Sequence, residues 1–87
     1  MASYRIEWRK STKNDLRKIE PQAVTRIIEA VESLAENPFP SGYRKLAQSS
    51  FAYRIRVGNY RILYEIIDDT LVIEVVKVGH RREIYRK

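Results

Sequence analysis

Three arginines in the second half of the sequence have the types and spacing needed to bind phosphate. Arg54 and Arg56 alternate with apolar residues. The pair Gly58-Asn59, typical of a two-residue hairpin turn, would then bring Arg61 directly opposite Arg56. Like charges that face each other across two strands destabilise the pairing unless an anion neutralises them. With Arg54 roughly 7 Å along the same face, the three guanidinium groups could hold one or two phosphates with bidentate geometry.

A purely structural role for these arginines is the alternative. Arg54 could pair with Glu74, two strands away across Leu63, while the other arginines are solvated. The three together, on a face opposite an apolar one, favour the binding of a nucleic-acid backbone, and of RNA in particular.

The C-terminal segment GHRREIYRK offers further candidates. Gly79 would let the chain turn sharply, so that His80, Arg81 and Tyr85 could come back over the arginine face. His80 is the only histidine and the default proton-transfer group near neutral pH, although a solitary surface histidine is more often inert. Tyr85 could stack on an exposed base or could anchor the C-terminus to the core.

Alternating apolar residues predict the strands that position these groups. A first strand is expected at residues 3–9, and later strands at 51–57, 60–67 and 71–78. A tight turn at Asp68-Asp69 would give the pairs Ile66–Leu71, Tyr64–Ile73 and Ile62–Val75, which places one apolar face on both hairpins. The opposite face would then carry Arg54, Arg56, Arg61, Leu63, Glu65, Val72, Glu74 and Val76.

Two helices are expected between the first strand and the hairpins. Thr12 and Asp15 have the spacing of a capping box before a short helix. Pro21 suits the first position of a longer one, whose apolar stripe runs to Ala35 before Asn37 and Pro38 stop it. The predicted class is α+β: a strand, a two-helix hairpin and a three-stranded antiparallel meander, with the helices packed on one face of the sheet.

Length and composition limit the function to one site on one domain. The chain has 87 residues, which we interpret as a single domain spanning 1–87. It carries 17 basic against 11 acidic residues, a net charge of +6 that indicates a polyanionic partner. It has no cysteine, and we find no secretory signal and no apolar run long enough to span a bilayer, so we expect a cytoplasmic protein with no membrane partner.

The order and spacing of several short segments resemble the RelE family of toxins, in the RelE and ParE superfamily of toxin–antitoxin systems. The segments are Tyr53-Arg54-Ile55-Arg56, Asn59-Tyr60-Arg61-Ile62-Leu63-Tyr64, Val78-Gly79-His80-Arg81 and Tyr85. The resemblance implies a RelE-like fold and an endoribonuclease that needs no metal or other cofactor. Such an enzyme enters the ribosomal A site, contacts ribosomal RNA and cuts mRNA by attack of a ribose 2′-hydroxyl, which inhibits translation. It also implies a cognate, RelB-like antitoxin with an acidic or amphipathic segment.

The resemblance implies a role for individual positions. Arg54 and Arg56 stand where well-known members have lysines, Arg61 matches the arginine that stabilises the phosphate, and Arg81 matches the one at the leaving 5′-oxygen. Tyr85 matches the tyrosine that stacks on the substrate base. We expect catalysis from Arg56, Arg61, His80, Arg81 and Tyr85, and RNA contacts from Arg54, Arg56, Arg61, Arg82 and Tyr85.

The general base is left open by this pattern. A lysine at the position of Arg56 has been proposed as the base, whereas a guanidinium cannot lose its proton in a protein. Either His80 takes that role, or the arginines only orient and stabilise charge while a ribosomal RNA group or water moves the proton. Two other functions remain open: a ParE-like toxin that binds DNA gyrase, and a non-toxic RNA-binding module.

Overall fold

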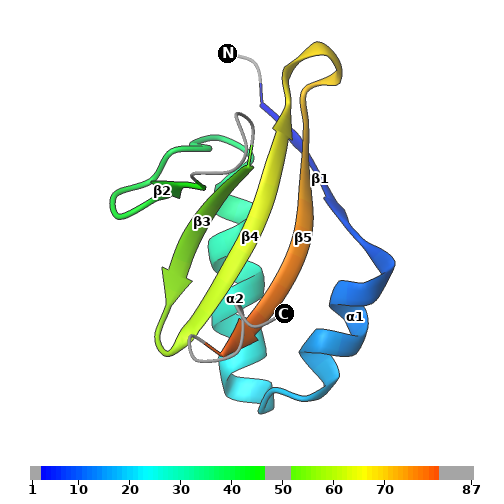
Figure 1. Ribbon diagram of the computed structural model, residues 1–87, viewed down its shortest axis with the longest axis vertical. Coiled ribbons are helices and arrows are strands. Elements are labelled where there is room, and N and C mark those ends of the chain that lie inside the picture. The colour runs from blue at the N-terminus through cyan, green and yellow to red at the C-terminus, as the bar shows by residue number, and fades with distance from the viewer. Residues whose placement is uncertain (1–2, 47–51, 81–87) are drawn as a thin grey trace.

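A five-stranded sheet with two helices makes up the part of the chain that the computed structural model describes, residues 3–46 and 52–80 (Figure 1). The elements are β1 (Arg5–Trp8), α1 (Lys10–Arg17), α2 (Pro21–Ser33), β2 (Arg44–Lys45), β3 (Ala52–Val57), β4 (Tyr60–Ile67), a short 3-10 helix (Asp68–Thr70) and β5 (Val72–His80). The strand order is β1-β5-β4-β3-β2; β1 runs parallel to β5, and the other neighbours are antiparallel. The predicted α+β class is confirmed, and β2 is a strand that the sequence did not predict.

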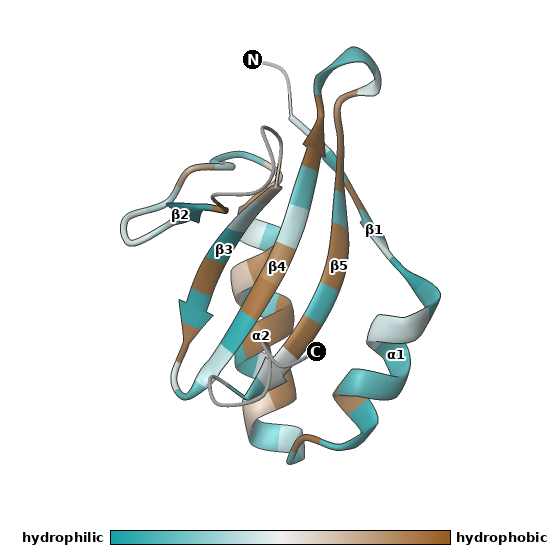
Figure 2. Ribbon diagram, in the orientation of Figure 1, coloured by the Kyte–Doolittle hydropathy of each residue, from teal (hydrophilic) through white to brown (hydrophobic). Residues whose placement is uncertain are grey.

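The core lies between the helices and one face of the sheet. In Figure 1, α2 lies behind β3, β4 and β5, and α1 lies beside the end of β5. Leu16 and Ile19, from α1 and the connection after it, pack against the same core as α2. Figure 2 shows hydrophobic and hydrophilic residues alternating along β3, β4 and β5, as expected for strands with one covered face. The buried core residues are Ile27, Val31, Leu34, Ile55, Ile62, Tyr64, Ile66, Ile73, Val75 and Val78.

The hairpin between β3 and β4 has the predicted register. Arg56 pairs with Arg61 and Ile55 with Ile62 across the two-residue turn. Gly58 takes a φ of +58°, a conformation that costs glycine little because it has no Cβ.

The hairpin between β4 and β5 does not have the predicted register. The connection contains the 3-10 helix and then Leu71 at a φ of +54°, so it is longer than the tight turn expected at Asp68-Asp69. Ile66 therefore pairs with Ile73 and Tyr64 with Val75, two residues further along β5 than predicted. A shift of two residues keeps each side chain on its face, so the predicted core residues of β4 are still buried. An irregularity between Leu63 and Tyr64 then adds one more residue to β5.

The first helix begins earlier than the capping-box pattern indicated. Arg9 is the residue before α1, and the hydroxyl of Thr12, which lies inside the helix, donates to the Arg9 carbonyl. The Asp15 carboxylate instead accepts a hydrogen bond of 3.1 Å from the Val78 backbone N–H on β5. Pro21 is the first residue of α2, as predicted, and the first strand spans Arg5–Trp8 where residues 3–9 were expected.

Candidate nucleic-acid interface

The sheet face that the helices leave uncovered, called the outer face below, carries the predicted arginines. Arg56 on β3 lies directly opposite Arg61 on β4, and Arg61 in turn lies opposite Gly79 on β5. Arg54 lies two residues from Arg56 and therefore on the same face. The sequence thus correctly predicted which arginines share a face and which two oppose each other.

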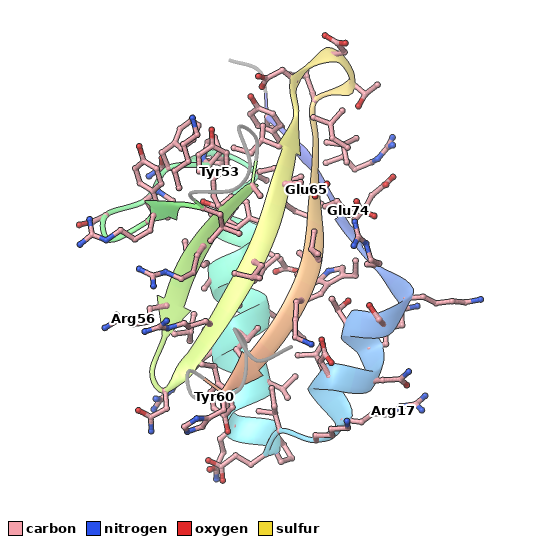
Figure 3. The ribbon with its side chains drawn as sticks, in the orientation of Figure 1. Arg17, Tyr53, Arg56, Tyr60, Glu65 and Glu74 are labelled. Atoms are coloured by element: carbon pink, nitrogen blue, oxygen red, sulfur yellow. The ribbon has the colours of Figure 1, made fainter. Side chains whose placement is uncertain are left out.

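The guanidinium groups are anchored to different degrees. Arg56 is exposed, whereas Arg54 and Arg61 are half-buried and their Nε atoms are buried. Figure 3 shows Arg56 near the end of β3, close to the β3–β4 turn. Since stems packed against a sheet have fewer rotamers to lose on binding, Arg54 and Arg61 are better preorganised than a fully solvated arginine.

Two further cations on this face were not predicted. The observed register places Lys77 opposite Leu63, at the position where the predicted register had Glu74. On the other side, β2 pairs Arg44 with Arg54, so Arg44 lies on the same face. The position of Lys77 depends on the longer β4–β5 connection, and that of Arg44 depends on the two-residue strand β2. Neither feature has a clear pattern in the sequence, so both residues were missed. Together they make the outer face more basic than the sequence indicated.

Acidic side chains occupy the opposite end of the outer face. Glu65 and Glu74 pair across β4 and β5, and Arg9 lies 4.0 Å from the Glu65 carboxylate and 3.1 Å from that of Glu74. The hydrogen bond to Glu74 raises the pKa of Arg9 above its usual value. Glu74 is thus bound by Arg9 and is not beside Arg54 in the sheet, contrary to the alternative considered from the sequence. Figure 3 shows Glu65 and Glu74 higher on the sheet than Arg56.

His80 lies on the face of the sheet that the helices cover. It pairs with Tyr60, whose ring packs on the core, and the two ring centroids are 5.8 Å apart in an edge-on arrangement. Arg61, the next residue along β4, points to the other face. The sequence had led us to expect His80 over the arginines. The structure contradicts this expectation, because His80 and the arginines lie on opposite faces of the sheet.

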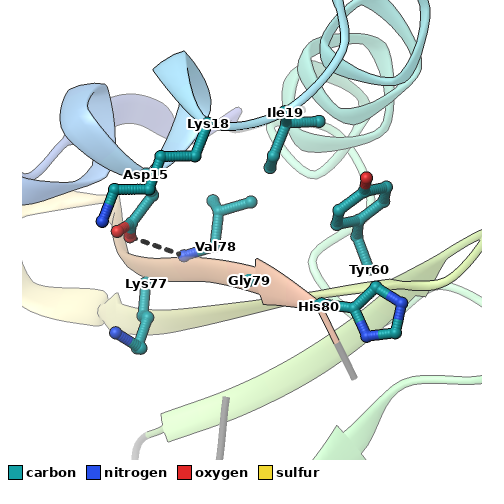
Figure 4. A pocket seen from close by; sticks show the side chains of 8 residues that line it. All are labelled: Asp15, Lys18, Ile19, Tyr60, Lys77, Val78, Gly79 and His80. Atoms are coloured by element: carbon teal, nitrogen blue, oxygen red, sulfur yellow. Dashed lines mark hydrogen bonds between the residues drawn. The ribbon is translucent and has the colours of Figure 1, made fainter. Parts of the chain in front are cut away.

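A cleft of about 350 Å³ lies beside His80, between the end of β5 and α1 (Figure 4). It is lined by Asp15, Lys18, Ile19, Tyr60, Lys77, Val78, Gly79 and His80. The Asp15 side chain in this cleft is already engaged by the Val78 N–H. Within residues 3–46 and 52–80, no group of three or more histidine, aspartate or glutamate side chains gathers where it could hold a metal ion.

The other predicted site residues, Arg81, Arg82 and Tyr85, lie outside the residues that the structure describes. For the described ranges, no helix is long and apolar enough to cross a membrane.

Comparisons with known proteins agree on one family. The sequence model described as the ParE toxin of the type II toxin–antitoxin system parDE matches residues 6–85. Toxin RelG of Mycobacterium tuberculosis is 28% identical over 85 residues, covering 97% of this chain and 98% of that protein. An archaeal RelE–RelB complex from Pyrococcus horikoshii superposes with a TM-score of 0.81 at 26% identity, over 93% of this chain and 98% of that one. A RelB–RelE antitoxin–toxin complex from Methanococcus jannaschii gives a TM-score of 0.71 at 30% identity, over 91% and 94% of the two chains.

Proposed function

The chain belongs to the RelE and ParE family of toxins from type II toxin–antitoxin systems, and on this basis we propose that it is a ribosome-dependent endoribonuclease that cuts mRNA in the ribosomal A site and so inhibits translation. Its place of action is then the cytoplasm, with mRNA and ribosomal RNA as its nucleic-acid partners. The similarity to toxins named RelE and RelG supports the nuclease over other activities within the family.

The observation that carries the proposal is the pairing of Arg56 with Arg61 on the sheet face that the two helices do not cover. Two guanidinium groups on neighbouring strands can contact the same phosphate group with bidentate geometry. The negative charge of a phosphodiester increases as the transition state forms. Fixed cations that are aimed at this developing charge are usually the largest single contribution to such catalysis.

The reaction would be an internal transfer within the RNA. The 2′-oxygen of one nucleotide forms a bond to the adjacent phosphorus, and the bond from phosphorus to the 5′-oxygen of the next nucleotide breaks. Arg56 and Arg61 would stabilise the phosphate oxygens, and Arg54 would orient the backbone. Arg81 would stabilise the departing 5′-oxygen, Tyr85 would stack on the substrate base, and Arg82 would add a backbone contact.

The proton of the 2′-hydroxyl must go to a group outside the arginines. A guanidinium has no lone pair to accept it and stays protonated in a protein. His80, on the face covered by the helices, is poorly placed to accept it. We therefore propose that water or a ribosomal RNA group takes this proton, while the arginines act through positioning and charge.

The test is cleavage of mRNA on programmed ribosomes by the parent protein and by Arg61→Ala. We expect the variant to cleave at least about 100-fold more slowly, as when a fixed transition-state donor is lost. Its stability should change by about 1 kcal/mol or less, the usual range for residues outside a core. Arg17→Ala, which removes the same charge from the far side of the molecule (Figure 3), is the matched control and should cleave like the parent. Loss of cooperative unfolding in Arg61→Ala, or cleavage at the parent's rate, would count against the proposal.

A second candidate function is suggested by the name of the matching family model. ParE-like toxins share this fold but poison DNA gyrase, and the model that matches residues 6–85 is the ParE toxin. Expression of the chain alone in bacteria separates the two activities. Translation arrest with cleaved mRNA supports the nuclease, whereas DNA damage and filamentation support gyrase poisoning. Harmless expression would favour a non-toxic RNA-binding module.

A cognate antitoxin is the protein partner that we propose. The solved relatives from Pyrococcus horikoshii and Methanococcus jannaschii are complexes of RelE with RelB. For this chain, a RelB-like partner with an acidic or amphipathic segment would cover the basic end of the outer face or pair with a strand edge.

A further inference from the structure

A line of side chains crosses the sheet at right angles to the strands. It consists of Arg44 on β2, Arg54 on β3, Leu63 on β4 and Lys77 on β5, each opposite the next, and is called the cross-strand row below. Neighbouring strands lie about 4.8 Å apart, so the backbone positions of Arg44 and Lys77 are about 14 Å apart. Arg56 and Arg61 lie about 7 Å from this row, two residues along β3 and β4.

The ends of the row are open to a ligand. Arg44 and Lys77 are both exposed. The acidic groups of the outer face form the next pair on that face, two residues further along β4, where Arg9 engages Glu65 and Glu74. Among the described residues, no carboxylate forms an ion pair with Arg44 or Lys77. The half-buried Leu63 lies between Arg54 and Lys77 and offers an apolar surface there.

We infer that the cross-strand row binds the backbone of single-stranded RNA crosswise to the strands, with Arg44 and Lys77 as positioning residues on either side of the reacting phosphate. This inference rests on the proposed nuclease and states how its substrate lies. Phosphates of a stacked strand are about 3.4 Å apart along the helix axis. A row of about 14 Å therefore spans up to about four phosphates of a stacked strand and fewer of an extended one. The row holds the flanking phosphates while Arg56 and Arg61 take the one that reacts.

An acidic protein segment would be attracted by the same charges, but the spacing favours a polynucleotide. Cations recur along one straight line, as charges do along a nucleic-acid backbone, and the break at Leu63 suits a sugar or a base more than a carboxylate. The row crosses the face of the sheet, and only its Arg44 end lies on an edge strand, β2.

The experiment measures the binding of labelled single-stranded RNA of five nucleotides, with 2′-O-methyl groups to prevent cleavage, at several salt concentrations. The proteins are the parent, Arg44→Gln, Lys77→Gln and the double variant. Each phosphate contact on a single strand contributes about 0.7 to the slope of log affinity against log salt. We expect each single variant to lose about 0.7 of slope and about tenfold in affinity at low salt, and the double variant to lose about 1.4 of slope. With a dinucleotide the variants should bind like the parent.

Two controls remove the same charge elsewhere. Arg17→Gln on α1 and Arg26→Gln on α2 are exposed and lie on helices that cover the other face of the sheet. Their slopes should equal that of the parent, because salt screens exposed charges beyond about 10 Å at 0.1 M.

Other results would overturn the inference. They are unchanged slopes in Arg44→Gln and Lys77→Gln, equal losses in the controls, or no binding of RNA by the parent even at low salt. On programmed ribosomes, both variants should raise KM while kcat stays within a few-fold, whereas equal losses in kcat would assign the residues to the reaction itself and refute a positioning role. If the parent binds the RNA with the expected slopes but cleaves no mRNA, the proposed function fails and the binding row stands. If the parent cleaves mRNA and the variants have the same salt dependence of RNA binding and the same KM, the proposed function stands and only the role of the cross-strand row is refuted.

Discussion

Arg56 and Arg61 lie opposite each other on the outer face, and a guanidinium group has no lone pair with which to accept a proton. Lysines in the same places could be deprotonated by burial or by a neighbouring cation, and could then act as bases. The arginines lack that option, but they offer bidentate contacts to phosphate oxygens. At these positions the chain therefore offers two positive charges and no side chain that could act as a general base.

His80 provides a test of that conclusion. Its ring packs edge-on against Tyr60 on the helix-covered face, so we expect no contact with the 2′-hydroxyl. His80→Gln should cleave mRNA within a few-fold of the parent in single-turnover experiments on programmed ribosomes, and its rate should depend on pH in the same way. A loss of about 100-fold or more, together with the disappearance of an inflection near neutral pH, would show that His80 is the general base after all.

Among the residues that the structure describes, Tyr64 is the largest fully buried side chain. Its hydroxyl connects the sheet to the loop after α2. The hydroxyl donates a hydrogen bond of 2.7 Å to the Pro38 carbonyl, and the ring stacks on Tyr53 at 5.9 Å. Burial, with smaller contributions from Tyr53 and Tyr43, raises the pKa of Tyr64 well above its usual value. The folded protein thus holds this proton more tightly than the unfolded chain does.

The raised pKa predicts how stability depends on alkaline pH. The effect on stability is constant below pH 10, because both states are then protonated. Above pH 10 the unfolded chain loses the proton first, so the free energy of unfolding falls by up to about 1.4 kcal/mol per pH unit through this group. Tyr64→Phe should lose about 1 kcal/mol at neutral pH with the hydrogen bond, and its stability should fall less steeply above pH 10. Urea unfolding at pH 8, 10 and 11 measures the loss of stability and its dependence on pH. If the free energy of unfolding falls equally steeply with pH in the parent and in Tyr64→Phe, the raised pKa is not that of Tyr64.

At the level of elements, β5 has two successive neighbours on one side: β1 along its first half and α1 along its second half. The last paired residue of β1 is Trp8, opposite Val75, and beyond that point the Asp15 carboxylate accepts the Val78 N–H. A backbone donor that would otherwise lack a strand partner is thereby satisfied by a side chain of the helix. This contact holds the end of β5 that carries Lys77 and Gly79.

Removing the contact should loosen the end of β5. In Asp15→Ala the Val78 amide has no acceptor from α1, so its hydrogen exchange should become faster by about tenfold or more, in line with the loss of a hydrogen bond to a charged group. Asp15→Asn keeps an acceptor oxygen and should restore most of the protection. The amide of Ile73, in the interior of β5, serves as the internal reference. Equal acceleration at Ile73 would indicate global destabilisation, and an unchanged Val78 amide would exclude the proposed role of Asp15.

The two hairpins show which parts of the fold the sequence determines locally. Gly58-Asn59 specifies a short turn by its own backbone preferences, so the register of β3 and β4 followed from those residues. Asp68-Asp69 has no such preference for two residues, and the chain instead forms a 3-10 turn that ends with Leu71 in the left-handed region. The alternation along β4 still identified the buried face, because a slip of two residues leaves it unchanged.

The candidate site was predictable to the same extent. Arg54, Arg56 and Arg61 lie in the hairpin whose turn is specified locally, and their arrangement was predicted correctly. Lys77 depends on the register of β4 with β5, which the longer connection and the irregularity near Leu63 both change. Arg44 depends on a strand of two residues that forms only because β3 offers its edge, and neither effect is visible in a local pattern.

At the level of the whole molecule, the excess of positive charge predicts how an antitoxin would bind. The formal net charge is +6, and the basic residues of the outer face lie together near the β3–β4 turn and β2. We expect the affinity of the purified toxin–antitoxin complex to fall as salt rises from 50 mM to 500 mM, because screening weakens contacts between exposed charges.

Charge variants distinguish an antitoxin that contacts the outer face from one that is attracted only by the net charge of the protein. Arg56→Gln should weaken the antitoxin complex and reduce its salt dependence, whereas Arg17→Gln should leave both close to the parent values. A complex in which the antitoxin contacts only the helices and leaves Arg54, Arg56 and Arg61 exposed would refute occlusion of the site.

The acidic and basic ends of the outer face give this face an electric dipole along the strands. Glu65 and Glu74 lie toward one end of the strands, and Arg56 and Arg61 toward the other. In the field of a polyanion such as a ribosome, this separation produces a torque that turns the basic end forward before any contact is made. A diffusive encounter with RNA would then begin in a nearly productive orientation, so the separation would speed association more than it would slow dissociation. Under the proposed function, the carboxylates of the opposite end would not touch the RNA but would help to set the rate at which the protein finds it.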